Sequence, residues 1–237
     1  MIIFAYNFHH QKTQDFLFYC HHYGFAIDAI LAADWRDLGL PSKSTRTGLR
    51  TFGTIHPAEI CASYDIPYFV MEHNSDDAID LLRDLKPELS LIAGARILSQ
   101  QVISEFDKGI INFHPGLIPE VRGLDCVEWA IYEGYPLGIT SHLIDRRVDA
   151  GRIIKRIEIP EYPDDTLIDL EDRLYRMQLK IFAETIETVL NSDANSFARV
   201  EHNAHSANGL FPFELIPALT SRFANRFPNA HSLESSD

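Results

Sequence analysis

The sequence of 237 residues predicts an α/β fold with a Rossmann-like, mostly parallel twisted sheet and helices on both faces. Short apolar runs alternate with helical patterns over the first two-thirds of the chain, as in parallel strands joined by crossover helices. Residues 89–93 form a nearly continuous apolar run, which is typical of a parallel strand buried on both faces. Beyond Gly134 the pattern changes to a hairpin, a long helix and a short C-terminal extension.

Each strand of the expected sheet is a short apolar run between polar or turn-forming residues. The runs that predict the parallel strands are residues 1–6, 26–32, 67–71, 89–93 and 109–113. Residues 137–144 and 152–159 follow, and the short polar turn between them predicts an antiparallel pair.

The expected helices lie between these strands, and several begin after a residue whose side chain can cap the first turn. In chain order they are residues 13–22 with Thr13 as cap, 57–64, 76–85 after Ser75, 100–106 after Ser99, and 125–133 ended by Gly134. One long helix is expected over residues 166–190, where Thr166 and Asp169 have the spacing of a capping box.

Composition limits the classes of protein to which the chain can belong. It carries 21 Lys and Arg against 34 Asp and Glu, a net charge of −13, so nucleic acid is not expected as a partner. No run approaches the roughly 20 apolar residues that span a bilayer, and the N-terminus lacks a signal-peptide pattern. The 3 cysteines never form a CxxC pair, which favours reduced thiols. We expect a cytoplasmic protein without a membrane partner, with a main domain over residues 1–200 and an extension over 201–237 whose last residues are disordered.

Several common motifs of catalysis and cofactor binding are missing from the sequence, namely GxGxxG, GxxxxGK[ST], GxSxG and HExxH. A nucleotide held by a glycine-rich first turn is therefore not expected. The pairs His9–His10 and His21–His22 are adjacent in sequence, so their side chains point in different directions. Neither pair predicts a metal site, and no metal is expected.

Chemistry is concentrated at Asn112 and His114, at the end of one predicted strand, and at Asp149, in the turn of the hairpin. Asn112 and His114 are two residues apart, so both side chains point to one face of a strand. The Asn112 amide can stabilise an oxyanion, His114 can transfer protons, and Asp149 can orient the imidazole or a water. No Ser or Cys is placed as a nucleophile, so the attacking group would belong to the substrate. Taken alone, an Asn-x-His pair is more typical of a strand end with a structural histidine.

Longer blocks of sequence surround these residues. Asn112-x-His114-Pro-Gly-Leu-Ile-Pro-x-x-Arg-Gly precedes Trp129-Ala-Ile, Leu137-Gly-Ile-Thr-Ser-His-Leu-Ile-Asp145 and Val148-Asp149-Ala-Gly-Arg-Ile-Ile154. In their order and spacing these blocks resemble those of the folate-dependent formyltransferases. Within that family, the chain is most similar in character to the sugar N-formyltransferases. The resemblance is strong over about residues 85–154, moderate to about residue 190 and weak elsewhere. It implies an enzyme that transfers the formyl group of N10-formyltetrahydrofolate to an amine, with Asn112, His114 and Asp149 as catalytic triad.

The resemblance also implies a pocket for the pterin ring of the donor. Residues 93–99 are similar to the segment that lines this pocket in the family, and the loop over 144–149 would close its other side. The residues expected to contact the ring are Arg96, Leu98, Ile103, Ile144, Asp145 and Val148. The alternatives are a surface ion pair for Arg96 and helix packing for Leu98 and Ile103.

The acceptor amine is predicted from features that the chain lacks. The family's glycinamide ribonucleotide enzymes carry a glycine-rich loop after the first strand, and its methionyl-tRNA enzymes carry a C-terminal barrel, for which the residues after Leu190 are too few. We therefore expect the amine of a nucleotide-linked amino sugar, used in polysaccharide biosynthesis. Its candidate contacts are Asn7, His9, His10, Lys43, Arg46 and Arg50.

Other functions remain open from the sequence. They are a variant glycinamide ribonucleotide formyltransferase, an amino-acid formyltransferase, a formyltetrahydrofolate hydrolase, and a folate-binding scaffold without activity. Relatives in the family are often dimers, so a homodimer is expected by analogy.

Overall fold

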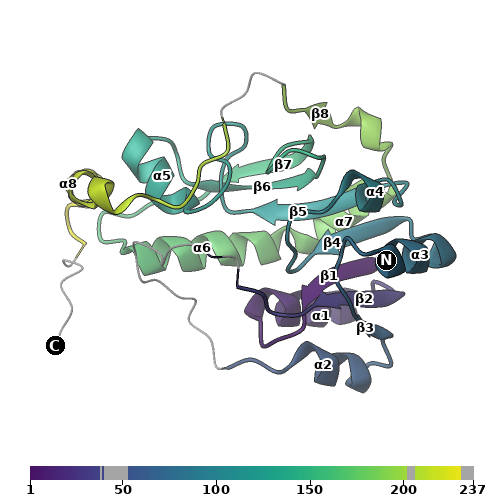
Figure 1. The fold of residues 1–237 in the computed structure, drawn as a ribbon. Helices are drawn as coiled ribbons and strands as arrows, with labels where there is room; N and C mark the ends of the chain where they lie inside the picture. Colours follow the sequence, from purple (N-terminus) through teal and green to yellow (C-terminus); the bar gives the residue numbers. More distant parts are fainter. Residues whose placement is uncertain (38, 40–52, 202–205, 231–237) are drawn as a thin grey trace.

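In the computed structural model, which describes residues 1–37, 39, 53–201 and 206–230, the strands form one twisted sheet (Figure 1). Its order is β3-β2-β1-β4-β5-β6-β7-β8. The strands are β1 (Ile2–Tyr6), β2 (Ala29–Ala33), β3 (Tyr68–Val70), β4 (Leu89–Ile92), β5 (Gly109–His114), β6 (Gly138–Leu143), β7 (Arg152–Glu158) and β8 (Ala198–Arg199). Strands β1 to β5 pair in parallel, and β6 to β8 continue the sheet in antiparallel pairs. This sheet confirms the predicted fold class.

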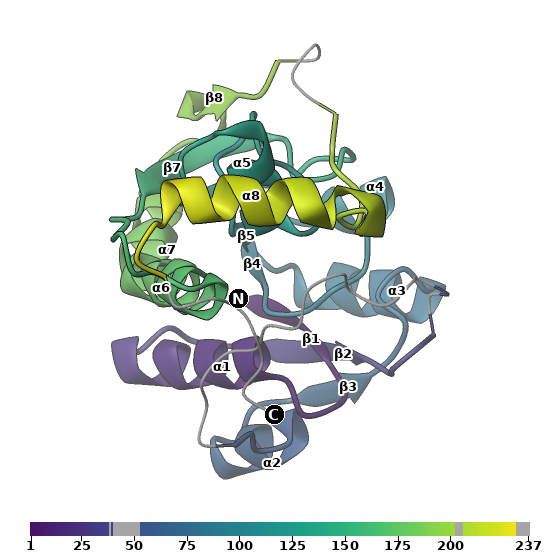
Figure 2. The same cartoon turned by 90° about the vertical axis from the view of Figure 1, so that its left-hand side faces the viewer.

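Helices cover both faces of the sheet, with α1, α6 and α7 on one side and α3 and α4 on the other (Figure 2). The helices are α1 (Gln11–Tyr23), α2 (Pro57–Ser63), α3 (Asp76–Leu85), α4 (Gln100–Ile103), α5 (Cys126–Glu133), α6 (Leu167–Lys180), α7 (Phe182–Leu190) and α8 (Ile216–Arg226), with short 3₁₀ helices η1 (Ala194–Ser196) and η2 (Phe213–Leu215).

The first strand shows how the sheet separates two apolar layers. Successive side chains of β1 point to opposite faces. Ile3 packs in one core cluster with Phe16 of α1, whereas Phe4 packs in the other with Leu82 of α3. Because both faces of β1 are buried, the strand is central, and it delivers the start of α1 to the carboxyl edge of the sheet.

Most helix ends lie where the sequence predicts them. Ser75 and Ser99 cap α3 and α4, and Thr166 and Asp169 form the expected capping box at α6. Gly134 ends α5 in the left-handed conformation, with φ of 81°.

Two boundaries near the N-terminus differ from the prediction. His10 caps α1 in place of Thr13, because the His10 ring accepts a hydrogen bond from the Thr13 N–H at 3.3 Å. Strand β2 begins at Ala29 because its partner β1 begins at Ile2, which pairs with Ala29. Residues 26–28 therefore have no strand beside them.

Two predicted helices are interrupted or shorter. The helix expected over 166–190 divides at Ile181, whose backbone (φ −95°, ψ 4°) leaves the helical region while its side chain stays buried. The bend lets α6 pack on β6 and α7 on β7. The helix expected over 100–106 ends at Ile103.

The segment over residues 206–230 packs beside α5. Helix α8 contacts α5, and Asn208 forms a backbone bridge to Gly123. Trp129 donates from its indole N–H to the Gly209 carbonyl at 2.9 Å and meets the ring of Phe211 edge-on. The C-terminal segment thus supports the chain directly after β5.

Within the part of the chain that the structure describes, no helix combines the length and apolar character needed to cross a membrane.

Candidate active site

The end of β5 carries the predicted pair to the carboxyl edge of the sheet. Asn112 and His114 lie on this strand, near the point between β1 and β4 where the strand order reverses and where open α/β sheets bind ligands. Strand β6 runs antiparallel beside β5 and places His142 directly opposite Asn112. The connection from β6 to β7 brings Asp149 back to the same place.

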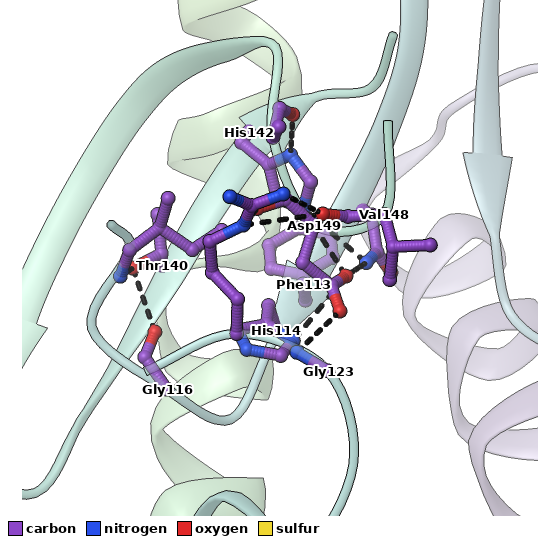
Figure 3. A network of polar contacts seen from close by, with 12 residues as sticks. Phe113, His114, Gly116, Gly123, Thr140, His142, Val148 and Asp149 are labelled. Carbon is purple, nitrogen blue, oxygen red and sulfur yellow. Dashed lines mark hydrogen bonds and ion pairs between the residues drawn. The ribbon is translucent and has the colours of Figure 1, made fainter. Parts of the chain in front are cut away.

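Asp149 is at the centre of the polar network in Figure 3. Its Oδ1 lies 3.4 Å from Nδ1 of His114, 3.3 Å from Nδ2 of Asn112 and 3.9 Å from Nε2 of His142. Its Oδ2 accepts a hydrogen bond of 3.0 Å from the Gly123 N–H. The structure therefore brings the three predicted side chains together and adds a second imidazole.

Hydrogen-bond partners assign the tautomer of His142. Its Nδ1 lies 2.7 Å from the Ala150 carbonyl oxygen, so Nδ1 carries the proton and donates it there. The bare Nε2 then accepts from Nδ2 of Asn112 at 3.3 Å. Both amide hydrogens of Asn112 thus have partners, His142 and Asp149. An oxyanion bound here would draw on a donor that is already oriented.

The same reasoning assigns His114. Its Nε2 lies 3.1 Å from the Val121 carbonyl oxygen and donates to it, which leaves Nδ1 facing Asp149. Burial lowers the pKa of His114, and the charge of Asp149 opposes that shift. Burial likewise lowers the pKa of His142, to about 4. Both rings are therefore neutral near pH 7, and His114 can accept a proton at Nδ1, where Asp149 would stabilise it.

Hydrogen bonds hold the loop after β5 against β6. The Thr140 hydroxyl donates to the Gly116 carbonyl at 2.7 Å and accepts from the Ile118 N–H at 3.0 Å. A Cβ atom at Gly116 would lie only 2.8 Å from Nε2 of His114. Glycine is therefore needed for the loop to pass this close to the imidazole.

Arg122 and Gly123 form hydrogen bonds that stabilise the turn carrying Asp149. Arg122 is buried and donates from Nε to the Asp149 carbonyl at 2.8 Å. Gly123 has φ of 92°, and a Cβ there would lie 2.1 Å from the Asn208 carbonyl oxygen. Only glycine fits, and this close approach directs its N–H to Asp149.

A cavity of about 200 Å³ opens beside Asn112 and Asp149. Five of the six residues predicted to contact the pterin ring line it, namely Arg96, Leu98, Ile144, Asp145 and Val148. The sixth, Ile103, lines a neighbouring cavity of about 290 Å³. Arg96 also makes an ion pair of 2.9 Å with Glu72. The ion pair that was the alternative role for Arg96 is therefore present, alongside its place in the cavity wall.

The residues predicted to contact the acceptor are spread along the same edge. Asn7 is held between Asp34 and Tyr68, at 2.8 Å from each. His9 is exposed, whereas His10 is the cap of α1, and its burial, with the charge of Lys12 beside it, lowers its pKa to about 4. The remaining predicted contacts lie outside the described residues; they are Lys43, Arg46 and Arg50.

A second, largely apolar cavity of about 510 Å³ is lined by two neighbours of the cluster. Gly123, which donates to Asp149, and Cys126, whose Sγ lies 3.4 Å from Nε2 of His114, both line it. Gln178 of α6 lines it too. That residue is 4% exposed, and its side-chain Oε1 has no hydrogen-bond partner among the described residues.

Sequence reasoning missed His142 and Gln178. His142 left a signal, since Thr140 and His142 form a polar pair two residues apart on an apolar strand and so face one side. Gln178 left one as well, because it follows Leu174 by four residues in the apolar stripe of the long helix.

Comparison with known proteins extends this picture. A family model for formyl transferases matches residues 51–186. The methionyl-tRNA formyltransferase of Akkermansia muciniphila is 37% identical over 129 residues, which are 54% of this chain and 41% of that protein. The chain thus spans about two-fifths of the length of this relative.

Solved structures show the same fold at low sequence identity. The phosphoribosylglycinamide formyltransferase from Streptococcus pneumoniae TIGR4 superposes with a TM-score of 0.60 at 20% identity, over 80% of this chain and 98% of the other. A sugar N-formyltransferase from Shewanella sp FDAARGOS_354 gives 0.59 at 16% identity, over 88% and 76%. Because the family model matches more than half of the chain, the protein belongs to the formyl transferase family.

Proposed function

We propose that the protein is an N-formyltransferase that moves the formyl group of N10-formyltetrahydrofolate to the amine of a nucleotide-linked amino sugar. The observation that carries this proposal is that Asn112 and Asp149 line the smaller cavity, while Gly123 and Cys126, which contact Asp149 and His114, line the larger one. A direct reaction between two bound molecules needs a reactive cluster that both can reach at once.

The smaller cavity supports a folate donor. Ile92, Leu98 and Ile144 supply apolar surface, and the loop over 144–149 adds polar and charged residues to the lining. Such a slot suits a flat ring whose edge carries polar atoms. Ile97 is 71% exposed at the same cavity and offers apolar surface to parts of the donor that extend outside.

The side chains of the cluster match the needs of formyl transfer. The bound donor supplies an activated formyl carbon, which the neutral acceptor amine attacks. One Asn112 N–H would exchange its present hydrogen bond, to His142 or Asp149, for one to the formyl oxygen and stabilise negative charge there. His114 would take the proton from the attacking nitrogen at Nδ1, Asp149 would stabilise the imidazolium, and the same proton would pass to the departing nitrogen. The protein then ends in its starting state.

The larger cavity supports an acceptor of sugar size. Its wall combines apolar side chains, Leu174 and Leu210, with the amide of Gln178 and the polar groups of Glu171 and Tyr175. A wall of this kind can receive both the C–H faces and the hydroxyl groups of a sugar ring. The net charge of −13 disfavours a large polyanion. The alternative acceptor is methionyl-tRNA, because the protein resembles methionyl-tRNA formyltransferases in sequence.

An acceptor panel tests the proposal. The protein is incubated with N10-formyltetrahydrofolate and, separately, amino-sugar nucleotides, glycinamide ribonucleotide, methionyl-tRNA or no acceptor, and products are analysed by mass spectrometry. We expect an amino-sugar nucleotide to gain the mass of one formyl group. Formylation of only one of the other acceptors would overturn the sugar assignment, and formate release without an acceptor would indicate a hydrolase.

A further inference from the structure

Lys12 lies in the first turn of α1, at the carboxyl edge of the sheet, and reaches the reactive cluster. Its Nζ donates a hydrogen bond of 3.0 Å to the Phe113 carbonyl. Phe113 is the residue between Asn112 and His114, so this bond holds the backbone that carries both. The Lys12 ammonium also lies 5.3 Å from the centre of the Phe16 ring.

Burial and the helix dipole both disfavour a positive charge at this place. The side chain is partly buried, and the described part of the chain gives its ammonium no ion pair with a carboxylate. Its position in the first turn puts a cation at the positive end of the helix dipole, where negative side chains are favoured. Burial lowers the pKa of Lys12 to about 8, and the charge of Asp149 opposes the shift. A cation kept at such a cost indicates a role in the reaction.

We propose that Lys12 is a positioning residue of the formyl-transfer site, which fastens the end of β5 through the Phe113 carbonyl and adds a positive charge beside the His114–Asp149 pair. The charge opposes protonation of His114 and so keeps its Nδ1 free to accept a proton from the acceptor. The kinetic part of this inference rests on the proposed function, whereas the effect on His114 does not.

Several other charged or titratable groups surround the pair and must be separated from Lys12. The Asp149 carboxylate favours the protonated form of His114, and Arg122 opposes it. His142 lies on the neighbouring strand, and Cys126 contacts Nε2 of His114. His10 precedes α1 and is itself influenced by Lys12. All of these groups are unchanged when Lys12 alone is replaced.

The test follows the titration of His114 by NMR in the full chain. Lys12→Met removes the charge and keeps the length of the stem, and Lys12→Arg keeps a charge. Lys108→Met is the matched control, because Lys108 also donates to a backbone carbonyl, that of Ser192, at 2.9 Å. Assignment of the His114 signal uses its loss in His114→Gln.

We expect Lys12→Met to raise the midpoint of His114 titration by roughly half to one pH unit. Lys12→Arg should largely restore it, and Lys108→Met should leave it unchanged. In formyl-transfer assays, Lys12→Met should lower kcat because the end of β5 loses its hydrogen bond at the Phe113 carbonyl, with KM for the donor retained. An unshifted midpoint in Lys12→Met, or an equal shift in Lys108→Met, would overturn the inference. If the wild-type protein transfers no formyl group, the proposed function fails, while the NMR result still decides whether Lys12 acts on His114.

Discussion

The Asp149 carboxylate faces Nδ1 of His114 at 3.4 Å, while the opposite nitrogen of that ring donates to the Val121 carbonyl at 3.1 Å. The carbonyl therefore keeps Nε2 protonated, and Nδ1 is the nitrogen that can gain and lose a proton. Asp149 can stabilise a positive charge that exists only while His114 holds the transferred proton. The rate should accordingly depend on the charge of Asp149 more than on its shape.

Replacement of Asp149 by Asn tests that dependence. The amide keeps the shape of the side chain but removes the negative charge, so His114 should lose the partner that stabilises its imidazolium. We expect kcat for formyl transfer to fall about 10²- to 10⁴-fold, with the fold retained by circular dichroism. Asp193→Asn, which changes the cap of η1, is the control and should keep wild-type turnover. Full activity of Asp149→Asn would refute a role for the charge.

Much of the fold can be predicted from local signals. Ser75, Ser99 and the Thr166–Asp169 box mark helix starts because a cap involves only residues three or four apart. The start of β2 cannot be read in this way, because it depends on pairing with β1, a strand distant in sequence. The His10 cap is missed because Thr13 is the more usual capping residue type.

The candidate site, too, can be predicted only where local sequence patterns determine it. Asn112 and His114 can be recognised because a strand places alternate residues on one face, and the longer motif then connects them to Asp149. Their contact with His142 depends on the register of β5 against β6, which no local pattern reports. The cavity at Gln178 depends on how α6 packs against the loop after β5, and this too is a tertiary property.

Because His142 is buried in its neutral form, the free energy of unfolding should decrease as the pH is lowered. Burial lowers the pKa of His142 to about 4, whereas the unfolded chain titrates near 6.5. Between these values the unfolded state binds more protons, so stability decreases as pH falls from about 6.5 to about 4. Below about pH 4, His142 alone lowers the free energy of unfolding by about 3 kcal/mol relative to pH 7.

Urea unfolding at several pH values between 7 and 4 measures this effect. His142→Gln should flatten the acid side of the curve relative to the wild type. His22→Gln, at an exposed position, should leave the curve unchanged. Equal acid slopes in the wild type and His142→Gln would contradict the assignment of His142 as a neutral base in the folded state.

Substitution of two glycines with similar backbone angles distinguishes the cost of a steric clash from the cost of backbone strain. Gly123 (φ 92°) and Gly134 (φ 81°) both have left-handed backbones, but an added Cβ meets Asn208 only at Gly123. Gly134→Ala should cost about 1 kcal/mol of unfolding free energy through strain alone. Gly123→Ala should cost more than about 2 kcal/mol and should also lower kcat, since the Gly123 N–H supports Asp149. Equal effects of both substitutions on stability and on kcat would show that the close approach of Asn208 has no consequence.

Gln178→Leu tests whether the larger cavity receives the acceptor. The Oε1 atom of Gln178 has no partner in the described structure, so an acceptor hydroxyl could donate a hydrogen bond to it. We expect KM for the acceptor to rise about fivefold to thirtyfold, corresponding to one lost hydrogen bond of about 1–2 kcal/mol, with KM for the donor unchanged. The thermal midpoint should stay the same or rise, because a buried carbonyl oxygen without a partner is replaced by an apolar side chain of similar size. Gln101→Leu, at an exposed position of α4, is the matched control and should alter neither KM. An unchanged KM for the acceptor together with a lower thermal midpoint would instead make Gln178 a structural residue.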